Sequence, residues 1–99
     1  MIVIYVAVTT KSDTAAEFER VISEIQRDVR TMAGCVKQEW YRDAEIPQRY
    51  LVYGEFDSQE NFDSYLSSNV VKRIGTDVMP LLEGPPEFRH YSATLLEGN

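Results

Sequence analysis

The chain begins with a segment, residues 2–10, that is apolar on both of the faces a strand would present. One face would carry four aliphatic side chains: Ile2, Ile4, Val6 and Val8. The other face would carry three apolar or aromatic side chains: Val3, Tyr5 and Ala7. This period of two, with many β-branched side chains, predicts a β-strand. A strand that is apolar on both faces is buried on both, so we expect helices on one side and a second cover on the other.

The next segment, residues 11–33, has the three- and four-residue spacing of an amphipathic helix. Its apolar side chains fall on one stripe: Phe18, Val21, Ile22, Ile25, Val29 and Met32. Thr14 followed by Glu17 matches a capping box, so the helix is expected to begin near Thr14. Gly34 is expected to end it as the C′ residue.

Residues 34–56 predict two strands joined by a polar loop. Aromatic and β-branched residues dominate both arms, and Asp43, Pro47 and Gln48 lie between them. After this hairpin, Ser58 can cap a short helix that runs through Leu66. Residues 67–69 then interrupt an apolar stripe that continues to residue 82, and Pro80 must kink or end that segment. Residues 87–95 are predicted to form the last strand.

The predicted element order is β-α-β-β-α-β, in a single α+β domain that covers residues 1–99. With right-handed crossovers, this order gives a four-stranded antiparallel sheet with both helices on one face, the ferredoxin-like arrangement. Simple alternation places these residues on the bare face: Val3, Tyr5, Ala7, Val52, Gly54 and Phe56. Since so apolar a patch does not face water in a monomer, we predict that two such sheets pack together in a two-fold homodimer with a barrel-like interior.

Charge and cysteine content narrow the classes of partner and location. The chain has 16 acidic and 10 basic residues and a net charge of −6, which disfavours nucleic acid and anionic membrane surfaces. No apolar run approaches the ~18–20 residues that span a bilayer, and the first residues lack the features of a signal peptide. Cys35 is the only cysteine, so no internal disulfide can form and a cytoplasmic location is expected.

Several segments, in this order and spacing, resemble a known family. They are Met1–Ile4, Gly34–Cys35, Glu39–Asp43, Arg49–Phe56 and Asn61–Ser68. Together they are similar to the antibiotic biosynthesis monooxygenase family of dimeric α/β barrel proteins, over nearly the whole chain. The resemblance implies the fold and the dimer argued above. It also implies, for some members, oxidation of quinols or anthrones by O₂ without a cofactor.

The chain departs from this family at positions that carry chemistry in other members. Tyr65 stands where a histidine is common, and Phe56 stands where many members have tryptophan. The quinone-forming branch uses an asparagine where this chain has Val52, and a pocket tyrosine of that branch falls near Phe62. These departures weaken any direct transfer of the family's catalytic residues.

Metal and cofactor chemistry find no support in the sequence. The haem-degrading branch of the family needs an asparagine where Tyr5 aligns and a haem-ligating histidine where Gly75 aligns, so we reject a haem-binding function. One histidine and one cysteine cannot build a zinc or iron site within a chain. No glycine-rich phosphate loop is present and nothing indicates a nicotinamide, so we expect no cofactor. A flavin stays open as the alternative, because a flavin can bind without such a fingerprint.

The candidate catalytic residues are His90, Tyr5 and Tyr65. His90 is the only histidine and would carry protons near neutral pH; the alternative is a strand histidine that is paired or exposed. Either tyrosine could donate a hydrogen bond to a substrate oxygen as negative charge develops there; the alternative is aromatic packing with the hydroxyl at the rim. The substrate ring is expected to contact three side chains: Val52, Phe56 and Phe62.

Other reactive residue types have simpler explanations. Cys35 is interpreted as a small buried apolar residue, and Trp40 is assigned to the core beneath the helices. Glu39 and Glu55 lie on adjacent predicted strands without a spacing signature, so solvation at an edge is favoured over a carboxylate pair.

Two classes of function follow. The first is a cytoplasmic monooxygenase that oxidises a small aromatic quinol or polycyclic phenol with O₂. The anion of such a substrate can pass an electron to O₂ itself, so the protein has to exclude water, orient the ring and stabilise the anion. The second is a non-catalytic dimeric barrel that binds a small apolar ligand or a partner, because a fold can persist after its chemistry is lost. An isomerase or cyclase that uses the same pocket also stays open.

Overall fold

The computed structural model describes residues 1–98, and its elements follow the predicted order. They are β1 (Ile2–Thr9), α1 (Ala15–Arg30), β2 (Cys35–Arg42), β3 (Arg49–Phe56), α2 (Gln59–Leu66), α3 (Asn69–Arg73), a π-helical turn (Ile74–Val78), a 3₁₀ turn (Met79–Leu81) and β4 (Glu87–Ser92). The predicted break after Leu66 is confirmed, and Pro80 lies in the 3₁₀ turn that ends the helical segment. The last strand stops at Ser92, short of the predicted 87–95.

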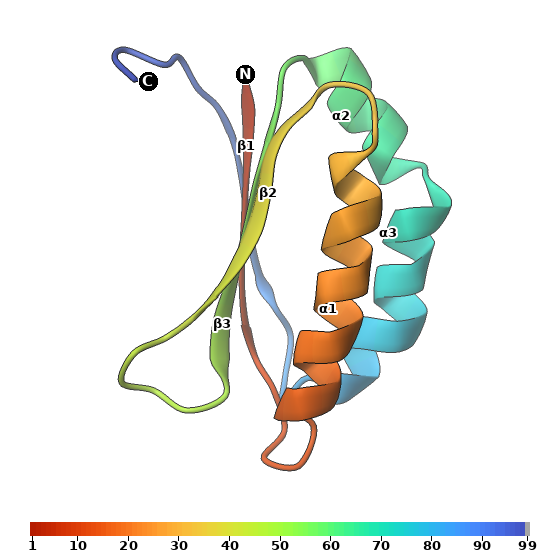
Figure 1. The fold of residues 1–99 in the computed structure, drawn as a ribbon, viewed down its shortest axis with the longest axis vertical. Coiled ribbons are helices and arrows are strands. Elements are labelled where there is room, and N and C mark those ends of the chain that lie inside the picture. Colours follow the sequence, from red (N-terminus) through yellow and green to blue (C-terminus); the bar gives the residue numbers. More distant parts are fainter. Residues whose placement is uncertain (99) are drawn as a thin grey trace.

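The four strands form one antiparallel sheet, and the helices all lie on one of its faces (Figure 1). The strand order is β2-β3-β1-β4, so the first strand lies inside the sheet, between the third and the fourth. This is the predicted ferredoxin-like α+β fold. None of the helices within residues 1–98 is long and apolar enough to cross a membrane.

Helix α1 buries the predicted stripe, but its two ends differ from expectation. Thr14 is the N-cap residue, yet its hydroxyl donates a hydrogen bond of 2.7 Å to the carbonyl of Leu81, so the capping box with Glu17 does not form. The helix stops at Arg30, earlier than predicted, and Gly34 has a φ of +81° in the turn that follows. A tertiary partner therefore replaced the local cap that the sequence pattern indicated.

The register between β1 and β3 decides which side chains face the helices. Ile2 lies opposite Phe56, and Val6 lies opposite Val52. Because directly opposed residues in an antiparallel pair point to the same side, Val52, Gly54 and Phe56 all belong to the helix-covered face. Their predicted place on the open face was wrong, and Phe56 is fully buried in the core. Alternation within each strand does not reveal how two strands are aligned.

The open face of the sheet is nevertheless apolar, with a different membership. Val3, Tyr5 and Ala7 alternate with the core residues of β1 and lie on this face, as predicted. The register adds four further side chains from the other strands: Tyr41, Leu51, Tyr53 and Tyr91. Tyr41 and Tyr91 are 47% and 48% exposed. No helix of the described chain covers this face (Figure 1).

Candidate functional site

A cavity of about 150 Å³ lies between the sheet and the helices. The sheet forms one wall, α1 a second, and the segment from α2 to the 3₁₀ turn a third. The polar members of its lining are few: Gln26, Gln38, Tyr65 and His90. The apolar members include Ile4, Val6, Phe18, Ile22, Ile25, Val52, Val71, Ile74 and Val78. The cavity is therefore suited to an apolar ring that carries one or two polar groups.

The lining has an exposed rim and a buried floor. Met79, Phe88 and His90 are exposed, and they lie on the 3₁₀ turn and on the edge strand β4. Gln26 on α1 and Gln38 on β2 are 1% and 3% exposed. The exposed part of the lining thus includes β4, whereas the two glutamines belong to its buried part.

Tyr65 points from α2 into the cavity wall. Ser58 caps α2 as predicted, since its hydroxyl accepts a hydrogen bond from the Asn61 amide at 3.2 Å. The Phe56 ring packs against the Tyr65 ring with centroids 5.2 Å apart. Burial raises the pKa of the Tyr65 hydroxyl, because the charged form would lose its hydration. The hydroxyl therefore stays protonated and can donate a hydrogen bond to a ligand.

His90 lies on β4 at the rim of the cavity. The Phe62 ring meets its imidazole edge-on, with centroids 5.0 Å apart. Phe62 and Phe56 are buried behind His90 and Tyr65 and are not among the residues of the cavity wall. These two phenylalanines thus support the polar side chains, and of the three predicted ring contacts only Val52 lines the cavity.

Tyr5 lies on the other side of the sheet from the cavity. Its neighbours along β1, Ile4 and Val6, line the cavity, so Tyr5 points to the open face. The structure thus brings together Tyr65, His90 and Val52 and separates Tyr5 from them. The catalytic roles of these residues stay predictions.

Sequence reasoning missed the two glutamines on the floor. Gln26 Nε2 donates to the Glu39 carbonyl at 2.9 Å, and Gln38 Nε2 donates to Gln26 Oε1 at 2.9 Å. A signal for Gln26 was available, because it is four residues after Ile22 and three before Val29, within the apolar stripe. Gln38 gave no comparable signal, since its neighbours in the strand are polar.

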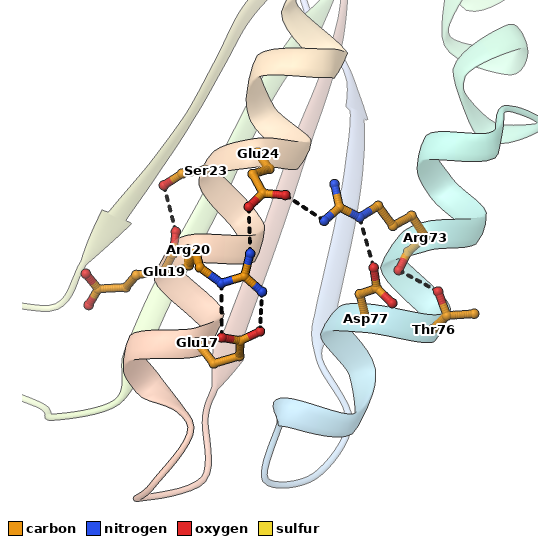
Figure 2. A network of polar contacts seen from close by, with 8 residues as sticks. All are labelled: Glu17, Glu19, Arg20, Ser23, Glu24, Arg73, Thr76 and Asp77. Carbon is orange, nitrogen blue, oxygen red and sulfur yellow. Dashed lines mark hydrogen bonds and ion pairs between the residues drawn. The ribbon is translucent and has the colours of Figure 1, made fainter.

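A network of charges fixes the helical wall of the cavity (Figure 2). Arg73 donates to Glu24 on α1 and to Asp77 on the π-helical turn, both at 2.9 Å. These hydrogen bonds hold the pKa of both carboxyls below their ordinary values. Two lining residues, Ile74 and Val78, belong to the same turn. The network therefore ties this part of the wall to α1, and Arg20 extends it along the helix.

The remaining reactive residue types take no part in the cavity. Burial raises the pKa of the Cys35 thiol, which disfavours the reactive thiolate. Trp40 faces the helices as predicted, and its indole donates to the Ser23 hydroxyl at 3.1 Å. Glu39 and Glu55 have separate partners, Lys37 at 3.7 Å for the first and the Tyr53 hydroxyl for the second: they form no carboxylate pair. Within residues 1–98, no cluster of three His, Cys, Asp or Glu side chains is arranged to hold a metal.

Solved structures share this fold across the whole chain. A candidate antibiotic biosynthesis monooxygenase from Deinococcus radiodurans superposes with a TM-score of 0.88 at 17% identity, covering 100% of this chain and 98% of the other. Rv0793 from Mycobacterium tuberculosis also gives 0.88, at 16% identity, over 99% and 98%. A candidate antibiotic biosynthesis monooxygenase from Caulobacter crescentus gives 0.88 at 21% identity, over 95% and 90%.

Sequence comparison assigns the chain to a family. No curated protein matches this chain. The sequence model of the family described as "Antibiotic biosynthesis monooxygenase" matches residues 1–77, which contain β1 to β3, all three α-helices and most of the π-helical turn. The chain therefore belongs to the antibiotic biosynthesis monooxygenase family.

Proposed function

We propose that this protein is a monooxygenase that oxidises a small aromatic quinol or phenol with O₂. The observation that carries the proposal is the apolar cavity with the Tyr65 hydroxyl and the His90 imidazole in its lining. Its volume of about 150 Å³ equals that of an engineered apolar cavity that binds benzene. A single ring fits this space, whereas a polycyclic phenol requires the wall to open.

The proposed chemistry uses the substrate as the source of all electrons. A hydroquinone loses a hydroxyl proton to His90, and Tyr65 donates a hydrogen bond to the resulting anion. The electron-rich ring reduces O₂, and one oxygen atom forms a new C–O bond. The second oxygen atom leaves as water, so a hydroquinone and O₂ give a hydroxyquinone and water. No external reductant is needed, and the apolar walls limit the access of water to the anion.

A second function, ligand binding without catalysis, is favoured by the size of the cavity. Pockets for drug-sized ligands usually enclose about 300–1,000 Å³, so the space here is small. The polar groups in its lining are few, and His90 is exposed at the rim. A small apolar cavity with few polar groups is sufficient for a protein that binds a small apolar molecule without catalysis.

Oxygen consumption separates these two functions. The purified protein is incubated in air with hydroquinone and methyl-substituted hydroquinones, and O₂ uptake and products are measured against the spontaneous rate. The monooxygenase predicts faster uptake, and one atom of ¹⁸O from ¹⁸O₂ in the product. Uptake at the spontaneous rate with every compound, together with ligand binding, would establish the non-catalytic alternative.

We also propose that the open face of the sheet packs against a second copy in a two-fold homodimer. The face carries seven apolar or aromatic side chains and no helix of the described chain covers it (Figure 1). Charged residues, among them Lys37, Glu39 and Arg89, share it. This mixture of an apolar centre and charged groups is typical of an interface between subunits. Sedimentation equilibrium should give twice the mass of the chain at micromolar concentration.

A further inference from the structure

The amide orientations of Gln26 and Gln38 follow from a chain of hydrogen bonds. The Glu39 carbonyl can only accept, so the Gln26 group that meets it at 2.9 Å is the NH₂. The other end of that amide, Gln26 Oε1, then accepts from Gln38 Nε2 at 2.9 Å. Gln38 must therefore present its oxygen, Oε1, on the remaining side.

That oxygen is buried and has no hydrogen-bond partner among residues 1–98. The absence of a side chain at Gly54 creates the space for it, because a Cβ atom there would overlap Gln38 Oε1 and lie 2.9 Å from Gln38 Cδ. A buried acceptor without a donor is destabilising, and native proteins rarely keep one. Both glutamines belong to the lining of the cavity, and both are buried.

We propose that Gln38 Oε1 is the acceptor for a hydroxyl group of the ligand, and that Gln26 positions it. This proposal concerns the ligand of the cavity described above and deepens the proposed function. The oxygen is sealed from water in the ligand-free chain, so a ligand hydroxyl reaches it after the surrounding side chains shift. The ring then occupies the apolar middle of the cavity, with Tyr65 and His90 towards its other end.

This arrangement selects the reduced form of an aromatic ligand. A phenol or hydroquinone has an O–H to donate to Gln38 Oε1, whereas a quinone or an ether offers only acceptors. A carbonyl placed against Gln38 Oε1 would leave two acceptors in contact. Oxidation turns the hydroxyl that donates to Gln38 Oε1 into a carbonyl, and the new hydroxyl of a hydroxyquinone is on a different ring carbon. The site thus favours binding of the hydroquinone and release of its product, because a site built around one hydrogen bond rejects a ligand that lacks the donor at that position.

Binding of two probes of similar shape tests the proposal without catalysis. The dissociation constants of phenol and toluene, which differ by a hydroxyl in place of a methyl group, are measured by NMR titration. We expect the ratio of the phenol to the toluene constant to rise about tenfold in Gln38→Met, as loss of one hydrogen bond predicts. Gln59→Met, which changes an exposed glutamine of α2, should leave the ratio unchanged.

A second variant covers the case in which Gln38→Met does not fold. The double variant Gln26→Leu/Gln38→Met removes both amides of the pair, which is less costly than leaving one buried partner alone, and it should show the same rise. An equal ratio in the wild type and in these variants overturns the proposal, as does the absence of binding by both probes. If the ratio depends on Gln38 while O₂ uptake stays at the spontaneous rate, this inference holds and the monooxygenase is excluded.

Discussion

Arg73 on α3 and Glu24 on α1 are joined by a hydrogen bond of 2.9 Å between Nη2 and Oε1, which connects two walls of the cavity (Figure 2). Both side chains are about one-third exposed. Single ion pairs of this kind contribute little to stability, but this guanidinium also holds Asp77. Its function is to fix the π-helical turn against α1, and the turn carries Ile74 and Val78 to the cavity.

Replacing Arg73 should make the stability of the fold less dependent on pH in the acidic range. Arg73 keeps the pKa of Glu24 and Asp77 below their ordinary values of 4.5 and 3.8. The stabilisation is therefore present above those values and is lost as the pH falls through the lower folded-state values. We expect the urea midpoint of Arg73→Met to lie below that of the wild type near neutral pH, and the two to converge below pH 3.8.

The same difference should shrink in about 1 M NaCl, where the screening length is about 3 Å. Arg27→Met, which removes an exposed arginine from the last turn of α1, is the control. A midpoint difference for Arg73→Met that is equal at all pH values would show that packing of the arginine stem matters and the charges do not.

Gly54→Ala should destabilise the fold through Gln38. The new Cβ would force the Gln38 amide away from Gln26, and overpacking of this kind usually costs about 1–3 kcal/mol. Adding Gln38→Ala to the same chain removes the obstacle, so the double variant should be more stable than the sum of the two single changes predicts. Urea denaturation measures all three variants, and strict additivity would contradict the contact. Gly75→Ala is the control, since nothing lies within 4 Å of the added Cβ.

Tyr65→Phe should separate activity from stability. The Tyr65 hydroxyl takes part in no hydrogen bond within residues 1–98, and burial is the main cause of its raised pKa. Removal of that group should not lower the unfolding free energy, because a buried hydroxyl without a hydrogen-bond partner adds nothing to stability. If Tyr65 stabilises the substrate anion, O₂ uptake should fall about a hundredfold, as for the loss of one donor to a developing anion. Tyr91→Phe, on the open face, should keep the wild-type rate.

Leu51→Arg should dissociate the proposed homodimer. Leu51 lies opposite Ala7 and Tyr41 on the open face, so the new charge would be buried in the interface without a partner. Sedimentation should then give the mass of one chain. Ile46→Arg changes an apolar residue of the β2–β3 loop that is 50% exposed, and should leave the dimer intact. A Leu51→Arg protein that keeps twice the mass would place the interface elsewhere.

Much of the fold could be predicted because it depends on local periodicity. Phe18, Ile22 and Val29 repeat at helical spacing, and α1 buries all three. Alternation in residues 2–8 gave β1, and the serines after Leu66 marked the break between α2 and α3. The element order then left few topologies, since crossovers in a sheet are right-handed. Each of these signals is carried by residues that are neighbours in the chain.

The candidate site could be predicted only in part. Tyr65 and His90 were identified by residue type, and the structure places both in the lining of the same cavity. Tyr5 was chosen by the same reasoning, yet one step along the strand separates it from Ile4 and from the cavity. The side-chain period of a strand is two, so the choice of face cannot be made from residue type alone.

The sequence by itself determined the elements, their order and the presence of an apolar sheet face, because hydrophobic spacing acts within each element. Only the tertiary structure decided the register that buries Phe56 beside Ile2 and the space above Gly54 that receives the Gln38 amide. These features depend on atoms that are far apart in the chain and meet only when strands and helix pack. These long-range contacts decide which polar groups line the cavity, and no local sequence pattern predicts them.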